Sequence, residues 1–221
     1  MKIIAMIPAR LGSQRLKQKN LQPLKGIPLI SHAIRKAKAS DMFDEIWVNS
    51  EADAFATIAK DEGVYFHKRP EELANNTATS EDFIYEFLKT HECDFVVQVH
   101  SIAPLLTVED TVNFVTELKR ANTDVLLSVE DVQIECAYQN KPINFTYDKK
   151  TNSQDLAPIQ RITWSITGWK RSIYIQAFEA KQCATYSGKV AYFPIGKLAS
   201  HIIKTQADLD IAEALYSVVN K

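Results

Sequence analysis

The sequence alternates short apolar segments with segments of helical periodicity, and this alternation constrains the fold more than any other feature. Apolar runs of this length are typical of strands buried in a parallel sheet. We expect strands at residues 2–8, 45–50, 64–66, 94–99, 124–129 and 189–194, and helices at 29–40, 52–62, 79–90, 108–120, 175–183 and 207–219. The pattern predicts an α/β protein with a mostly parallel sheet, whose ligands bind beyond the carboxyl ends of the strands. The loops to inspect follow Pro8, Ser50, Val99 and Val129.

The alternation breaks between residues 132 and 170, where Tyr, Trp and Pro residues surround a polar stretch at 148–153. We therefore expect a single domain over residues 1–221 that carries residues 132–170 as an inserted subdomain or arm.

Composition restricts the class of protein. Hydrophobic residues make up 46% of the chain, enough for a large core. No apolar run approaches the roughly 18 residues of a membrane span. The apolar N-terminus is too short for a signal peptide, and the three cysteines show neither CxxC spacing nor an even number. We expect a cytoplasmic protein that does not contact the membrane.

The charge is distributed unevenly. The first 40 residues hold nine Lys or Arg and no Asp or Glu, whereas the remaining 181 hold 17 basic and 27 acidic residues. A basic block of this kind indicates a local anionic ligand. A nucleic-acid-binding arm is the rival explanation, but the block is interleaved with apolar residues and has no aromatic platform for stacking bases.

The loop after the first strand, at residues 9–20, places four cations within ten residues. It has neither the GxGxxG of dinucleotide-binding proteins nor the GxxxxGK[ST] of a P-loop. Arginine forks and lysine point charges suit the oxygens of a triphosphate. A solvated charged loop is the alternative interpretation, and the absence of acidic residues makes it the weaker one.

This loop carries a resemblance to a known family. The matching residues are Ile7-Pro8-Ala9-Arg10-x-Gly12-Ser13, Lys19-Asn20 and Pro23-Leu24-x-Gly26-x-Pro28. They resemble the N-terminal signature of the CMP-sugar synthetases, which are the acylneuraminate and 3-deoxy-octulosonate cytidylyltransferases. Three further segments, at residues 69–80, 104–105 and 205–213, resemble later motifs of that family. The resemblance implies the Rossmann-like three-layer sheet of nucleotide-diphospho-sugar transferases.

The resemblance also implies an activity and its residues. The activity is the transfer of CMP from CTP to a 2-keto-3-deoxy sugar acid, with release of pyrophosphate, on a pathway to surface polysaccharide. The resemblance assigns catalysis to Arg10, Lys19, Asp208 and Asp210. It assigns acceptor binding to Asn20, His100 and Ser101. Nucleotide binding falls to Ala9, Arg10, Leu11, Gly12, Ser13, Arg15, Lys19, Asn20, Arg69, Ala78 and Ser80.

Magnesium is the expected cofactor, with Asp208 and Asp210 as its ligands, because Mg²⁺ is usually held by one or two carboxylates together with phosphates and water. Two residues at positions i and i+2 of an extended segment point to one face. The alternative is that a helix begins here and uses one of the two aspartates as a cap.

The acceptor half of the family pattern is altered. His100 stands where the family has Gln, and Ser153 stands where an Arg would hold a sugar carboxylate. An acceptor such as a sialic, legionaminic or octulosonic acid is the first hypothesis, and a phosphonate or sugar phosphate is the second. A non-catalytic nucleotide-binding protein is a third. The family context also implies a homodimer, with residues 132–170 crossing to the partner.

Overall fold

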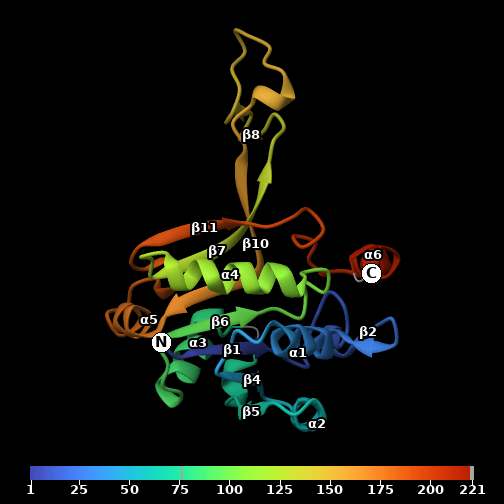
Figure 1. Cartoon of the computed structure of the whole chain (residues 1–221), viewed down its shortest axis with the longest axis vertical. Helices are drawn as coiled ribbons and strands as arrows, with labels where there is room; N and C mark the ends of the chain where they lie inside the picture. The colour runs from blue at the N-terminus through green and yellow to red at the C-terminus, as the bar shows by residue number, and fades with distance from the viewer. Residues whose placement is uncertain (76, 220–221) are drawn as a thin grey trace.

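A computed structural model describes residues 1–75 and 77–219 of the chain. Its centre is a seven-stranded sheet with the order β11-β7-β10-β6-β1-β4-β5 (Figure 1). The strands are β1 (Ile3–Pro8), β4 (Glu45–Ser50), β5 (Tyr65–Lys68), β6 (Phe95–Val99), β7 (Val125–Val132), β10 (Ile159–Lys170) and β11 (Val190–Pro194). Two short hairpins pair β2 (Pro23–Leu24) with β3 (Ile27–Pro28) and β8 (Ala137–Tyr138) with β9 (Lys141–Pro142).

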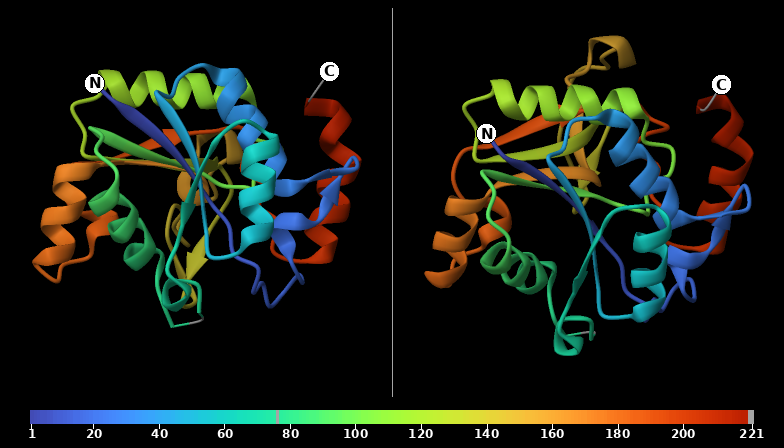
Figure 2. Two further views of the ribbon diagram at one scale, coloured as in Figure 1. Left: turned by 90° about the horizontal axis from the view of Figure 1, so that it is seen from below. Right: turned by 60° about the horizontal axis from the view of Figure 1, so that its bottom comes forward.

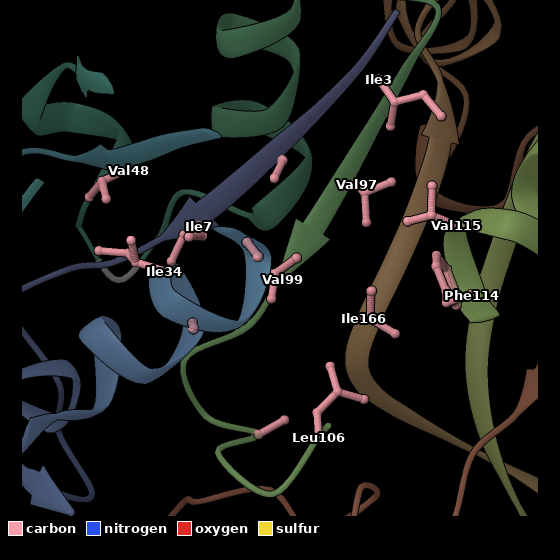
Figure 3. Close-up of a cluster of buried hydrophobic side chains, with 14 of the residues drawn as sticks. Ile3, Ile7, Ile34, Val48, Val97, Val99, Leu106, Phe114, Val115 and Ile166 are labelled. Carbon is pink, nitrogen blue, oxygen red and sulfur yellow. The ribbon is translucent and has the colours of Figure 1, made fainter. Parts of the chain in front are cut away.

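Helices cover both faces of the sheet, as the two views of Figure 2 show. They are α1 (Leu29–Ser40), α2 (Asp53–Asp61), α3 (Ser80–Thr90), α4 (Val108–Arg120), α5 (Arg171–Glu179) and α6 (Gln206–Val219). On one face, side chains of α1, α2 and α4 pack on alternate residues of the strands, such as Ile7 and Val97 (Figure 3). On the other face, α3 and α5 pack on Ile4, Val96 and Trp169. The predicted three-layer α/β fold with a mostly parallel sheet is confirmed.

The strand order reverses at β1, which pairs in parallel with β4 on one side and with β6 on the other. β4 and β5 follow on one side, whereas β6 and every later strand of the central sheet lie on the other side. The carboxyl ends of β1 and β6 therefore form the topological switch point of the sheet, where ligands bind in open α/β folds.

Three helices begin with the same Thr-x-x-Asp capping box, in which the threonine and aspartate satisfy backbone N–H groups of the first turn. The three helices are α3, α4 and α6. The pairs are Thr79 with Asp82, Thr107 with Asp110, and Thr205 with Asp208.

The insertion predicted at residues 132–170 is narrower in the structure. Residues 133–158 project from the body as an arm, at the top of Figure 1. β10, however, runs from the arm into the central sheet, where it pairs antiparallel with both β6 and β7. Buried hydroxyl residues on β10, among them Thr163 and Ser165, hide this strand from a search for apolar runs. Helix α5 also begins earlier than predicted, at Arg171, directly after β10.

None of the helices in the described part of the chain combines the length and apolarity that crossing a membrane requires.

Gly168 on β10 tests the packing between the sheet and α4. A Cβ atom added at this position would lie 2.8 Å from Cδ2 of the buried Leu118. We expect Gly168→Ala to lower the free energy of unfolding by about 1–3 kcal/mol, because the core must shift to admit the methyl group. Urea denaturation measures the change. Gly196→Ala is the control, since its Cβ would meet nothing within 4 Å, and equal stability of the two variants would contradict the packing.

Candidate functional site

A cavity of about 480 Å³ lies at the switch point of the sheet. Its volume is within the range of about 300–1,000 Å³ that is typical of small-molecule sites. The walls come from the loop after β1, the residue after β5, the start of α3, the end of β6 with its following loop, and the segment before α6. The lining residues are Pro8, Ala9, Arg10, Ser13, Gln14, Arg15, Leu16, Lys19, Asn20, Arg69, Ser80, Phe83, Gln98, His100, Ser101, Ile102 and Lys204.

Backbone and side-chain hydrogen bonds hold the loop after β1 in place. The N–H of Ala9 donates to the carbonyl oxygen of Asn49 at 3.0 Å. The N–H of Leu11 donates to a carboxylate oxygen of Glu51 at 2.8 Å. Arg10 donates from Nη1 to the carbonyl oxygen of Asn75 at 3.2 Å. The loop is thus attached to the end of β4 and to the segment before α3, and its cations face the cavity from a defined backbone.

Asn20 joins this loop to the loop after β6. Its Nδ2 donates to the carbonyl oxygen of Arg10 at 3.2 Å, and its Oδ1 accepts from the hydroxyl of Ser101 at 2.7 Å. Both Asn20 and Ser101 are buried. The two loops at the switch point therefore form one connected wall, in which Asn20 and Ser101 also line the cavity.

Arg69 is a buried cation at the cavity wall, with only 3% of its surface exposed. It donates from Nε to Oδ1 of Asn49 and from Nη2 to the carbonyl oxygen of the same residue, each at 2.7 Å. Its guanidinium carbon lies 4.2 Å from the centre of the Phe83 ring. Burial lowers the pKa of Arg69 to about 10, so the group stays charged at neutral pH.

The cavity concentrates positive charge. Five cations line it, namely Arg10, Arg15, Lys19, Arg69 and Lys204, and none of the described residues in the lining is acidic. Burial, and then repulsion by Arg15, Arg10 and Lys204, lowers the pKa of Lys19 below its usual value, while Asp208 acts in the opposite direction. An anion in the cavity would relieve this repulsion, so the arrangement favours a multiply charged anionic ligand.

Gln98 and His100 line the cavity, and each has a buried side-chain nitrogen without a partner among the described residues. The Nε2 atoms of both residues are buried and make no hydrogen bond within the described part of the chain. Burial, and then the charge of Lys19, lowers the pKa of His100 to about 4. The imidazole is therefore neutral at physiological pH and adds no positive charge to the cavity.

Asp208 and Asp210 depart from the predicted geometry. They lie in helix α6 and not in an extended segment, so positions i and i+2 are about 200° apart around the helix axis. Asp208 accepts hydrogen bonds from the N–H groups of Lys204 and Thr205 and from the Thr205 hydroxyl. Asp210 accepts from Nε2 of Gln206. The expectation that both carboxylates share one face is wrong, and the alternative of a helix cap describes Asp208.

The structure brings most of the other predicted site residues together. Ala9, Arg10, Ser13, Arg15, Lys19, Asn20, Arg69, Ser80, His100 and Ser101 all line the cavity. Leu11, Gly12 and Ala78 do not, and neither do the loops that follow β4 and β7. Sequence reasoning missed Phe83, Gln98 and Lys204. Lys204 directly precedes a recognised motif, which was the available signal for it, whereas Phe83 reads simply as a core residue of a helix.

Comparisons with known proteins bring in one family of proteins. A family model described as cytidylyltransferase matches residues 4–210. The chain is 33% identical over 128 residues to N-acylneuraminate cytidylyltransferase A of Danio rerio, which covers 58% of this chain and 30% of the relative. It is 41% identical over 90 residues to N-acylneuraminate cytidylyltransferase of Escherichia coli, which covers 41% of this chain and 22% of the relative. These matches span less than a third of either relative.

A solved structure resembles the whole chain. It is a CMP:2-keto-3-deoxy-manno-octonic acid synthetase complexed with CTP, and it aligns with a TM-score of 0.73 at 16% identity, covering 99% of each chain. This likeness shows the fold.

A substitution at Asn49 tests how much the hydrogen bond from Arg69 contributes to stability. Replacing the fully buried Asn49 by Leu removes the Oδ1 acceptor and leaves a buried cation with one fewer partner. We expect the free energy of unfolding to fall by about 1–3 kcal/mol, as measured by urea denaturation. Asn122→Leu on an exposed loop is the control. If the two variants unfold at the same urea concentration, the Asn49–Arg69 contact does not stabilise the fold.

Proposed function

The chain belongs to the cytidylyltransferase family, and on that premise we propose that it transfers CMP from CTP to a small sugar acid and releases pyrophosphate. The acceptor class that we propose is the 2-keto-3-deoxy sugar acids, which include sialic, legionaminic and octulosonic acids. Its product would be a CMP-sugar for surface polysaccharide, made in the cytoplasm. The observation that carries the proposal is the cavity at the switch point, with five cations and no acidic lining residue among those described.

The proposed reaction requires that negative charge be neutralised and that two groups be aligned. An oxygen of the acceptor hydroxyl forms a bond to the α-phosphorus of CTP, the bond from that phosphorus to the bridging oxygen breaks, and the hydroxyl proton passes to water. Catalysis of such transfers comes mainly from positioning and charge stabilisation. Lys19 and Arg10 supply charge from the loop after β1, which hydrogen bonds hold to β4 and to the segment before α3.

A second part of the wall, which contains Arg69, Ser80 and Phe83, suits a pyrimidine base. Arg69 and Ser80 offer hydrogen-bond donors there, and Phe83 offers an apolar ring beside them. Arg69 is fixed by two hydrogen bonds to Asn49, so its position is set before a ligand binds. Rigid donors of this kind discriminate between bases, because a base with a mismatched edge leaves buried polar groups unpaired.

Magnesium remains a predicted cofactor, but Asp208 and Asp210 do not fit it as a pair. Mg²⁺ prefers oxygen ligands, usually one or two carboxylates together with phosphates and water. Asp208 uses its Oδ2 in the capping box of α6. Asp210 accepts a hydrogen bond from Gln206, the first residue of the same helix. Neither residue lines the cavity.

The acceptor would lie beside Gln98 and His100. Both residues line the cavity, and a sugar hydroxyl or acyl group that reached their buried Nε2 atoms, which lack partners among the described residues, would satisfy them. A phosphonate or sugar phosphate is the alternative acceptor, since the cations of the cavity also suit a second anionic group.

We also propose a homodimer that forms through the arm at residues 133–158. Four large apolar side chains on this arm are exposed, Ile134, Tyr138, Ile143 and Tyr147. Exposed apolar side chains that gather on one projection are typical of an interaction surface.

The assay that tests the function measures pyrophosphate release from CTP with a panel of sugar acids, phosphonates and sugar phosphates. ATP, GTP and UTP serve as nucleotide controls. Release that needs CTP and one acceptor supports the proposal and identifies the acceptor. Tight CTP binding with no turnover across the panel indicates instead a non-catalytic nucleotide-binding protein, and absence of CTP binding contradicts the proposal.

Lys19 gives a direct test of the charged loop. We expect Lys19→Met to lower kcat by about 100-fold or more, because a preorganised cation at the reacting phosphate is lost. Steady-state kinetics with the acceptor found in the panel measures this. Lys197→Met is the control, since Lys197 is exposed and does not line the cavity. A Lys19 variant with the kcat of the control would remove Lys19 from the mechanism.

The arm gives a separate test. We expect the wild-type chain to have the mass of a dimer by size-exclusion chromatography with light scattering. The double variant Tyr138→Ser, Ile143→Ser should shift toward the monomer, because it removes exposed apolar surface from the arm. The matched control is Tyr192→Ser, an exposed aromatic residue on β11 in the body. A wild-type chain that elutes as a monomer at micromolar concentration would refute the dimer.

A further inference from the structure

Lys204 is a cation of the cavity that the proposed reaction has not yet used. It lies on the segment between β11 and α6 and lines the cavity together with Lys19. Its charge is near enough to act on Lys19. In the described residues, no ion pair engages its ammonium group. Its charge is therefore available to a ligand.

The backbone around Lys204 is held firmly. The N–H of the buried Ile203 donates to the carbonyl oxygen of Ile102 at 2.8 Å, which ties this segment to the loop after β6. The N–H of Lys204 itself donates to Oδ2 of Asp208 at 2.9 Å. The capping box of α6 thus positions Lys204 at the cavity, and Asp208 acts as a positioning residue.

The acidic residues of the described chain offer little to a metal at this place. No group of three or more His, Cys, Asp or Glu residues among them is arranged to hold an ion. The cavity lining has no carboxylate, and the two aspartates nearest in sequence to Lys204 are engaged within α6. A triphosphate carries up to four negative charges at neutral pH, and the groups of the protein that can neutralise them here are the cations of the cavity.

We propose that Lys204 binds the phosphates of CTP, and that with Lys19 it supplies the positive charge that a metal held by the protein would otherwise supply. This inference rests on the proposed function. Lys19 is half-buried in the wall, whereas Lys204 is exposed and lines the same cavity. Lys204 therefore contacts the terminal phosphates, which leave as pyrophosphate, and Lys19 contacts the phosphate that is transferred.

The contact proposed for Lys204 predicts different effects on CTP and CMP binding, because CMP lacks the terminal phosphates. We expect Lys204→Met to weaken CTP binding by about 10- to 100-fold, the range expected for loss of a hydrogen bond to a charged group. CMP binding should change by less than about twofold, since CMP makes none of the contacts removed. Lys204→Arg should recover most of the CTP affinity. A purely structural role would weaken the binding of both nucleotides alike.

Isothermal titration calorimetry in EDTA measures these affinities on the full chain. Lys197→Met is the matched control, because it removes the same charge from the same connecting segment outside the cavity lining. Thermal unfolding of each variant checks that the fold is intact. Replacing an exposed lysine should leave the melting temperature unchanged. Equal CTP affinity in Lys204→Met and the wild type would overturn the inference.

The aspartates provide the second arm of the test. The ratio of CTP affinity with Mg²⁺ to that in EDTA should be the same in the wild type, Asp208→Asn and Asp210→Asn. Taking the ratio cancels any effect of Asp208 on the position of Lys204. A ratio that collapses toward one in both variants would show a metal site on these carboxylates and overturn the inference.

Failure of the inference is distinguishable from failure of the function. A wild-type chain that binds CTP and transfers CMP, with Lys204→Met unaffected, contradicts the role of Lys204 alone. A wild-type chain that binds CTP neither with Mg²⁺ nor in EDTA contradicts both proposals together.

Discussion

The pairing of β1 with parallel strands on both sides determines where everything else can lie. Because β4 and β6 run in the same direction as β1, the loops after β1 and β6 emerge side by side at one edge of the sheet. The core on both faces is built on alternate residues of these strands. The cavity occupies the place where the connections diverge, and the hydrogen bond between Asn20 and Ser101 joins the two loops there.

The uneven charge along the sequence has a structural counterpart. Arg10, Arg15 and Lys19, from the basic first 40 residues, line the cavity, and Arg69 and Lys204 come to them from distant parts of the chain. Nearby acidic groups accept hydrogen bonds from the backbone instead, as Glu51 does from the N–H of Leu11. Repulsion among the cations opposes folding of the empty protein, and the packed core and the hydrogen bonds of the loops offset it.

The sequence was informative about elements with strong periodicity and much less about contacts between distant segments. The bounds of α1, α4 and β4 were predicted correctly, because apolar spacing marks all three and a capping box also marks the start of α4. The sequence pattern did not predict β10, because the buried residues of this strand include hydroxyl residues such as Thr163 and Ser165. Asp208 was assigned to a metal although Thr-x-x-Asp opens two other helices of the same chain. The place of Lys204 in the cavity depends on the Ile203–Ile102 contact, for which sequence spacing gives no signal.

The anchoring of Ile203 to Ile102 has a consequence for biosynthesis. Chains are made from the amino terminus at about 5–20 residues per second. The strands from β1 to β6 can pair as soon as residue 99 is available, but the wall that contains Lys204 needs about 100 further residues. For several seconds a nascent chain therefore carries an incomplete, strongly basic cleft. A nucleoside triphosphate can make all of its proposed phosphate contacts only after this last wall has docked, so part of its stabilising effect comes late, on a body that is already folded.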